Sequence, residues 1–329
     1  MNQALTTLKN NRALSLTLAN VAIYLLAILA NDPFAWFAKS YQTAPAFFAS
    51  PPEAISKLSI QKTSAPEASF TLEKEGELWF VHKQGKHVAD PEKIKTLLAS
   101  VQNAKRFTIV TSSKDKAKDF GFGKTDELRI EAFAADKSQG YMLLGSLAGR
   151  GSYTHVRWKD ENDIYLVEDN LKSSAGRGKF DDFIEKSLSP KESKAEDIVA
   201  ISLNTGDSKT SYNLVLENKK WQLKSPVEKE VPASLLQSLL SKLLSIRASE
   251  VILGDEYKKL IGGSQPSELK FSTKFKNGTI PTELVILGQD KESKSYFVQK
   301  KGGNTVYKLS EYELQAIFSF DPLAEPPKN

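Results

Sequence analysis

Two short loops contain the residue types that could bind an anion. They are Gly149-Arg150-Gly151 and Gly176-Arg177-Gly178. Glycine allows successive backbone N–H groups to converge on a ligand, and arginine adds a fixed positive charge with several donors. The same residue types are also typical of a flexible hairpin or loop that binds nothing. We therefore expect two loops, with anion binding as the alternative hypothesis.

A glycine-containing stretch from Gly121 to Thr125 resembles the end of a phosphate-binding P-loop. Its last three residues are Gly123-Lys124-Thr125. The motif also requires a glycine five residues before Gly123, and position 118 is lysine. The residues before the stretch are charged, whereas a P-loop follows a buried strand. This stretch therefore predicts a structural turn.

The remaining reactive side chains match no catalytic or metal-binding motif. The three histidines are His82, His87 and His155, and cysteine is absent. His82 and His87 flank Gln84-Gly85, which predicts a hairpin tip, and no motif supplies the further ligands that a metal site requires. A Gly-x-Ser-x-Gly nucleophile motif is also absent. We therefore predict no metal, no cofactor and no enzymatic activity.

The elements that would position these side chains follow a pattern that the chain contains twice. Equivalent residues lie roughly 141 to 143 positions apart, and they are apolar, aromatic or glycine residues, which serve in packing and turns. The clearest markers are three pairs: Trp79 and Trp221, Gly145 and Gly288, and Tyr165 and Tyr307. No set of catalytic groups repeats with them. The repeat therefore predicts a duplicated scaffold.

Each repeat consists of many short strands and one substantial helix. The strands are predicted by segments in which apolar and polar residues alternate. Turns rich in glycine, proline and aspartate separate these segments. Asp90 and Pro91 begin the main helix of the first repeat, and apolar residues at Ile94, Leu97 and Val101 form one face. Most strands have no helix between them, which argues against parallel β-α-β units. The sequence predicts an α+β fold: an N-terminal transmembrane helix, then two tandemly duplicated domains, each an antiparallel sheet with a helix.

The expected boundaries follow from these signals. The first α+β repeat covers residues 55–188, a polar linker covers 189–196, the second repeat covers 197–320, and a tail covers 321–329. The main helix of the second repeat is expected at Ser234–Ile246, and closing helices are expected at Phe180–Leu188 and Tyr312–Phe318. Because the linker is polar, we expect the two repeats to unfold largely independently.

Residues 13–30 form the only long apolar run, and they contain no charge. This length is close to the roughly 18–20 residues that cross a bilayer as a helix. Lys9 and Arg12 precede the run and Asp32 follows it, which predicts a cytoplasmic N-terminus (residues 1–12) and an extracytoplasmic body. Residues 31–54 would then be a juxtamembrane connector. The alternatives are a cleaved signal peptide and a buried core helix.

Composition limits the classes of partner. The chain has 329 residues, of which 40% are hydrophobic and 26% are charged, as is typical of a folded protein. The net charge of +5 is too weak to argue for nucleic acid. We therefore expect no nucleic acid among the partners, and the sequence specifies no small-molecule ligand.

The order of these markers resembles the bacterial proteins that carry domain of unknown function 4340, in two tandem copies. The matching residues of the first repeat are Trp79, Ala89-Asp90-Pro91, Asp119-Phe120-Gly121-Phe122, Leu144-Gly145, Tyr153 and Ile164-Tyr165. Those of the second are Trp221, Leu260-Ile261-Gly262, Pro266, Leu287-Gly288, Tyr296 and Val306-Tyr307. The first repeat departs from the pattern at Thr125 and Asp126, where a proline is expected. The resemblance implies a membrane-tethered extracytoplasmic protein associated with ABC-type exporters and gliding-like auxiliary systems, and it implies no catalytic residues.

Two functional hypotheses follow. The first is a non-enzymatic accessory protein, anchored by a single span in the bacterial inner membrane, with a protein partner in an ABC-type envelope transport system. The second is a binding module that holds a lipid, a glycan or a peptide in the cleft between the two domains. A deep apolar cleft between the domains would favour the second hypothesis.

Overall fold

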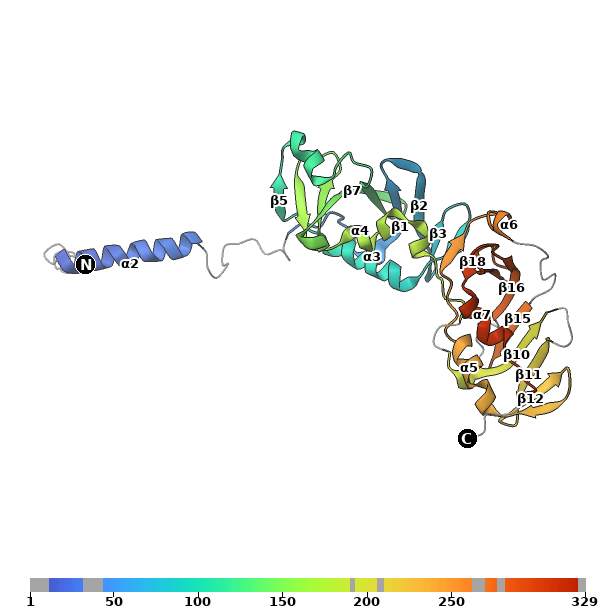
Figure 1. Cartoon of the computed structure of the whole chain (residues 1–329). Coiled ribbons are helices and arrows are strands. Elements are labelled where there is room, and N and C mark those ends of the chain that lie inside the picture. Colours follow the sequence, from blue (N-terminus) through green and yellow to red (C-terminus); the bar gives the residue numbers. More distant parts are fainter. Residues whose placement is uncertain are drawn as a thin grey trace.

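Two nine-stranded antiparallel sheets form the body of the protein (Figure 1). This computed structural model describes residues 12–31, 44–189, 193–205, 210–261, 270–276 and 282–324. The first unit contains β1 (Ile55–Lys62), β2 (Ala65–Glu75), β3 (Leu78–His82), β4 (Lys86–Val88), β5 (Thr108–Thr111), β6 (Leu128–Ala134), β7 (Lys137–Ala148), β8 (Tyr153–Trp158) and β9 (Ile164–Val167). The second contains β10 (Ile198–Asn204), β11 (Tyr212–Glu217), β12 (Lys220–Ser225), β13 (Lys229–Val231), β14 (Glu250–Ile252), β15 (Lys270–Phe275), β16 (Thr282–Gln289), β17 (Tyr296–Lys300) and β18 (Val306–Leu309).

The two sheets have the same strand order. The first runs β4-β3-β2-β1-β6-β7-β8-β9-β5, and the second runs β13-β12-β11-β10-β15-β16-β17-β18-β14. The helices of the first unit are α3 (Pro91–Asn103) and the short α4 (Leu171–Ser174). Those of the second are α5 (Ala233–Leu243), α6 (Tyr257–Leu260) and α7 (Glu311–Phe318). The predicted α+β class with two antiparallel-sheet units is therefore confirmed.

Local sequence explains why α3 begins where it does. The Asp90 side chain accepts a hydrogen bond from the Glu92 N–H at 3.0 Å, and Pro91 occupies the first helical position, where no N–H is needed. Ile94, Leu97 and Val101 are buried, so the apolar stripe covers the sheet. In α5 the equivalent stripe is Leu236, Leu239 and Leu243. The predicted main helices are therefore present in both units.

The repeat markers occupy equivalent places. Trp79 pairs with Lys74 across β2 and β3, and Trp221 pairs with Leu216 across β11 and β12. Tyr165 pairs with Ile109 and Tyr307 pairs with Val251, in each case between the last two strands of the sheet. The two tyrosines are 7% and 6% exposed, which shows that both are core residues.

Gly145 and Gly288 allow a loop to lie directly on the sheet. A Cβ atom at Gly145 would collide with the Phe120 carbonyl oxygen and the Phe122 ring. A Cβ atom at Gly288 would lie 2.9 Å from the Ile261 side chain. In both units the segment before the central strands therefore approaches the backbone more closely than any larger residue permits.

The predicted closing helix Phe180–Leu188 is wrong. The chain forms only a 3-10 turn, η6 (Phe180–Phe183), and then continues extended, with Ile184 bridged to Ala89. Two backbone N–H groups of this extended segment bond to residues outside it: Glu185 N–H donates to the Val88 carbonyl, and Leu188 N–H donates to the Ile246 carbonyl. In the second unit α7 (Glu311–Phe318) is a helix, as expected.

The described start of the segment that joins the units is packed rather than loose, and residues 190–192 lie outside the described part. Leu188 and Ser189 are buried, and the Ser189 hydroxyl donates to the Leu243 carbonyl at 2.7 Å. The same hydroxyl accepts from the Ile246 N–H at 3.0 Å. One continuous cluster of buried apolar side chains includes residues of both units. The expectation of independent unfolding, which rested on a polar linker, is therefore replaced by one of coupled units.

The N-terminal region contains the helix α2 (Arg12–Asn31), which covers the predicted apolar run. Within the residues that the structure describes, no helix is long and apolar enough to cross a membrane. Of the expected segments, residues 1–11, 32–43 and 325–329 lie outside the described part, as do residues 206–209, 262–269 and 277–281 of the second repeat, with its markers Gly262 and Pro266. The last residues of the expected connector belong to the first unit, because Phe47 and Phe48 are buried against Trp158, with ring centroids 5.9 and 5.3 Å away.

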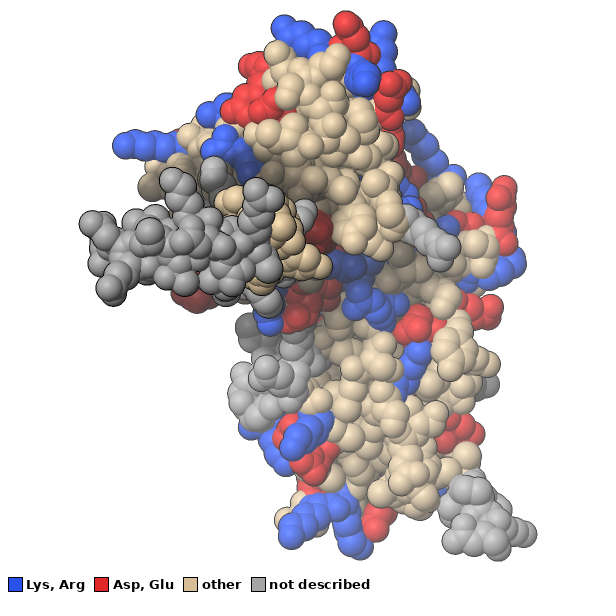
Figure 2. All heavy atoms as spheres, turned by 90° about the vertical axis from the view of Figure 1, so that its left-hand side faces the viewer, with Lys and Arg blue, Asp and Glu red and all other residues tan. Residues whose placement is uncertain are grey.

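Charged side chains of both signs are mixed on the surface. Figure 2 shows Lys and Arg beside Asp and Glu on both units, with uncharged surface between them. Several lysines form ion pairs with nearby carboxylates, for example Lys301 with Glu283 at 2.8 Å. This arrangement agrees with the small net charge of the chain.

Replacing the two tryptophans by alanine should lower the free energy of unfolding by different amounts. Trp221 is 6% exposed, so Trp221→Ala should cost about 3–5 kcal/mol of unfolding free energy. Trp79 is partly exposed, so Trp79→Ala should cost less. Urea unfolding followed by circular dichroism measures both, and Trp221→Phe serves as the conservative control. An equal or larger loss in Trp79→Ala would show that the two sites are packed alike.

Candidate functional site

The predicted anion-binding loops lie on different elements of the first unit. Gly149–Gly151 forms the 3-10 turn η4 between β7 and β8, and Gly176–Gly178 forms η5 after α4. A Cβ atom at Gly178 would lie 2.7 Å from Leu128, and one at Gly176 would lie 2.9 Å from Phe183. These two glycines are thus explained by close packing. The Arg177 side chain is exposed and that of Arg150 lies outside the described residues, so anion binding at the loops stays a prediction.

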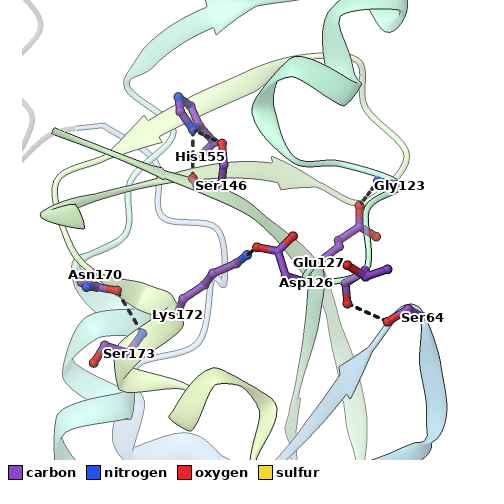
Figure 3. A network of polar contacts seen from close by, with 10 residues as sticks. Ser64, Gly123, Asp126, Glu127, Ser146, His155, Asn170, Lys172 and Ser173 are labelled. Atoms are coloured by element: carbon purple, nitrogen blue, oxygen red, sulfur yellow. Dashed lines mark hydrogen bonds and ion pairs between the residues drawn. The ribbon is translucent and has the colours of Figure 1, made fainter. Parts of the chain in front are cut away.

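Figure 3 shows the polar network that fixes the Gly121–Thr125 turn. Glu127 is buried, and its carboxylate accepts from the Gly123 N–H and from the Thr63 hydroxyl, both at 2.7 Å. The Ser64 hydroxyl donates to the Thr125 carbonyl at 2.6 Å. Because these contacts are internal, the stretch is a structural turn, as predicted.

A buried lysine continues this network. Lys172 of α4 lies 2.8 Å from the Asp126 carboxylate, and this hydrogen bond is the largest factor that lowers the pKa of Asp126. Asn170 caps α4 by accepting from the Ser173 N–H at 3.0 Å. His155 donates from Nδ1 to the Ser146 carbonyl at 2.9 Å, which makes it a structural histidine. The network therefore ties α4 to the start of β6 rather than presenting free groups to a substrate.

The junction between the units contains the second group of titratable side chains. His87 of β4 is buried, with Nδ1 2.7 Å from the Thr305 hydroxyl of the second unit and Nε2 3.3 Å from the Lys83 carbonyl. A carbonyl can only accept, so the neutral ring carries its proton on Nε2 and Nδ1 accepts from Thr305. Burial lowers the pKa of His87, the Lys83 contact raises it, and the nearby His82 lowers it.

Lys300 lies in the same junction. Its ammonium group donates to the Ser187 carbonyl at 3.3 Å, and burial lowers the pKa of Lys300 while the Glu185 carboxylate opposes that shift. Burial also raises the pKa of Tyr307. Among the described residues, no three His, Asp or Glu side chains are grouped so that they could hold a metal ion. The junction is thus a polar seam between two folded units.

Two surface grooves are the clearest candidate binding sites. One, of about 350 Å³, lies along α3 and is lined by Pro52, Glu53, Ile55, Lys74, Trp79, Pro91, Ile94, Lys95, Leu98, Ala99 and Gln102. The other, of about 440 Å³, lies between α5 and α7 and is lined by Ser238, Ser241, Lys242, Ser245, Tyr312, Gln315, Ala316 and Ser319. Each lies within one unit. The sequence placed Trp79 in the core and gave no signal for a groove beside it.

Acidification should weaken the junction through His87. Its folded pKa lies below the unfolded value of about 6.5, so the unfolded state takes up the proton first as the pH falls. The stability that His87 contributes is present above about pH 6.5 and is lost as the pH falls through the folded pKa. Urea unfolding between about pH 7.5 and about pH 5 measures this loss.

In that series, His87→Gln should flatten the pH dependence, whereas His82→Gln, at the partly exposed end of β3, should retain most of it, because His82 is the smallest of the three causes acting on the pKa of His87. An unchanged pH profile in His87→Gln would place the responsible group elsewhere.

Comparison with known proteins identifies one relationship. The family model described as "Domain of unknown function (DUF4340)" matches residues 79–266. This match begins at Trp79 of the first unit and ends in the second, so it spans the junction and does not appear as two separate copies. Neither the comparison with curated proteins nor that with solved structures gave a match. Since the matched residues make up more than half of the chain, the protein belongs to the DUF4340 family.

Proposed function

We propose that the protein is a non-enzymatic accessory protein of an ABC-type envelope transport system. In this proposal the uncharged run 13–30 anchors it in the bacterial inner membrane with the N-terminus in the cytoplasm and the body outside, on the evidence of the sequence. The body then contacts a protein subunit of the transport system. The link to transport comes from the resemblance to the DUF4340 proteins. The exposed apolar surface of α2 supports the anchor, and the open edge strand β5 supports the protein contact.

The exposed apolar surface of α2 carries the anchoring part of the proposal. All its described side chains, at positions 16, 17 and 19–28, are exposed, and they include Leu16 at 66%, Tyr24 at 74% and Leu26 at 64%. The body does not cover them, so something else must remove this surface from water. The whole uncharged run 13–30 and the basic residues before it favour a bilayer with the N-terminus inside.

An open edge strand supports a protein partner. β5 is the last strand of the first sheet, at the left of the first unit in Figure 1, and Ile109 and Val110 are 52% and 39% exposed. In the second unit the equivalent strand β14 is covered: Val251 and Ile252 are 5% and 9% exposed, and Ile252 packs with Ile261. An exposed apolar edge strand is a common docking site for an extended segment of another protein.

The binding-module hypothesis receives less support from this geometry. A deep apolar cleft between the units would favour it, whereas the described junction contains buried residues, including His87, Leu188 and Ser189. The two grooves above lie within single units. A lipid, glycan or peptide held between the units therefore stays an alternative prediction.

The anchoring part predicts a change of cell fraction. The full chain should remain in the membrane pellet after alkaline carbonate washing, and a chain that lacks residues 1–31 should move to the soluble fraction. The mass of the intact extracted protein should correspond to a start at Met1. A shorter mature chain would indicate a cleaved signal peptide, and a soluble full-length chain would contradict the anchor.

The edge-strand part predicts loss of a specific partner. Ile109→Lys should reduce co-purification of an ABC-type transporter subunit with the detergent-extracted protein, because a buried lysine charge opposes docking at β5. Val227→Lys is the matched control, since Val227 is 49% exposed on the second unit. Equal recovery of the subunit with both variants would remove β5 from the interface, and absence of any transporter subunit with the unmodified chain would contradict the proposed function.

A further inference from the structure

The groove along α3 is open and is lined largely by apolar side chains. The Trp79 ring, Ile94 and Leu98 form its floor together with Ile55 and the prolines Pro52 and Pro91. Trp79 and Leu98 are only partly buried, although both pack against the core. Covering such an apolar surface with another apolar group removes it from water and is therefore favourable.

The second unit carries different side chains at the equivalent positions. Lys74 pairs with Trp79 on neighbouring strands of the first unit, and Leu216 holds the position of Lys74 beside Trp221. Along the main helices the buried residues Ile94 and Leu236 correspond, so Gln102 of α3 corresponds to Leu244 at the end of α5. Leu216 and Leu244 both pack against the core, and Trp221 is buried.

The first unit therefore lacks two leucine side chains that the second supplies from its own chain. Where the second unit has Leu216 and Leu244, the first has Lys74 and Gln102, and both of these polar side chains line the groove. The groove, of about 350 Å³, lies at this place. The internal comparison thus indicates that an aliphatic side chain of leucine type is the group that fits.

The charges at the groove add a second requirement. Lys74 and Lys95 line it, against one carboxylate from Glu53. Within the described part of the chain, neither lysine forms an ion pair, whereas the neighbouring Lys57 lies 4.0 Å from Glu73. A ligand that carries a carboxylate beside its aliphatic side chain would meet both the apolar floor and these amines.

We propose that the groove beside Trp79 binds a peptide segment of a partner protein that inserts a leucine-type side chain over Trp79 and places an acidic residue beside Lys74 or Lys95. This inference rests on the proposed role as an interaction protein and assigns to it a recognition site separate from β5. A peptide is the favoured occupant because the second unit has leucine side chains packed against the core at the equivalent positions, and because Lys74 and Lys95 complement an acidic residue.

The test uses the purified full chain and synthetic peptides with blocked termini. The probe peptide is Gly-Glu-Leu-Gly-Glu-Leu-Gly, and its matched controls replace both leucines by serine or both glutamates by lysine. Isothermal titration calorimetry measures affinity, and ¹⁹F NMR of fluorotryptophan-labelled protein reports on Trp79, assigned through Trp79→Phe. The probe should bind and shift the Trp79 signal, and each control peptide should bind about tenfold more weakly or worse.

The decisive variant gives the first unit the residues of the second. The double substitution Lys74→Leu and Gln102→Leu should fill the groove, abolish peptide binding, and leave the melting temperature unchanged or higher. Lys93→Leu is the matched control, because Lys93 is exposed on α3 and does not line the groove. It should bind the probe as the unmodified chain does.

Several outcomes would overturn the inference. They are absence of probe binding to the unmodified chain, equal binding of the leucine and serine peptides, and unchanged binding in the double variant. Concentration-dependent dimerisation that the double variant abolishes would assign the groove to a second copy of the chain instead. Any of these results, obtained while membrane retention and Ile109-dependent recovery of a transporter subunit persist, would refute the groove and leave the proposed function standing.

Discussion

The structure depends on one packing requirement: an apolar helix must cover one face of each nine-stranded sheet. The main helix of each unit meets it, with Ile94, Leu97 and Val101 in α3 and with a leucine stripe in α5. Burial of such a stripe is the main source of stability for an α+β unit. Both sheets have the same strand order, and in each unit the main helix follows the fourth strand along the chain.

Once this requirement is met, the two units differ at their margins. β5 is open where β14 is covered, the groove beside Trp79 is open where Trp221 is buried, and the first unit ends in an extended segment where the second ends in α7. In the first two comparisons the second unit buries apolar side chains that the first unit leaves partly exposed. The first unit also supplies the histidine side of the polar seam. The duplicated scaffold thus has two units that differ in apolar exposure at these two places.

The local features were predictable from sequence, and the long-range ones were not. The start of α3 depends on Asp90 and Pro91, which act within one turn, and the paired markers such as Gly145 and Gly288 reveal the duplication. The extended course of residues 184–188 depends instead on bonds to Val88 and Ile246, which are distant in sequence. The groove beside Trp79 was recognised by comparing Lys74 and Gln102 with the residues at the equivalent positions of the second unit. That comparison depends on the strand register of both sheets, which the sequence does not give.

The point where the chain enters the first unit sets a mechanical limit on the protein. Ala46 is bridged to Lys105, and Phe47 and Phe48 are held in the core, so the body begins at a fixed place. Between Asn31 at the end of α2 and Ala44 there are twelve residues, which span at most roughly 45 Å when fully extended. The entry point of the body therefore lies within that distance of the end of α2. Leu188 and Ser189 form hydrogen bonds to Ile246 and Leu243, so the second unit is joined to this entry point through the packed first unit.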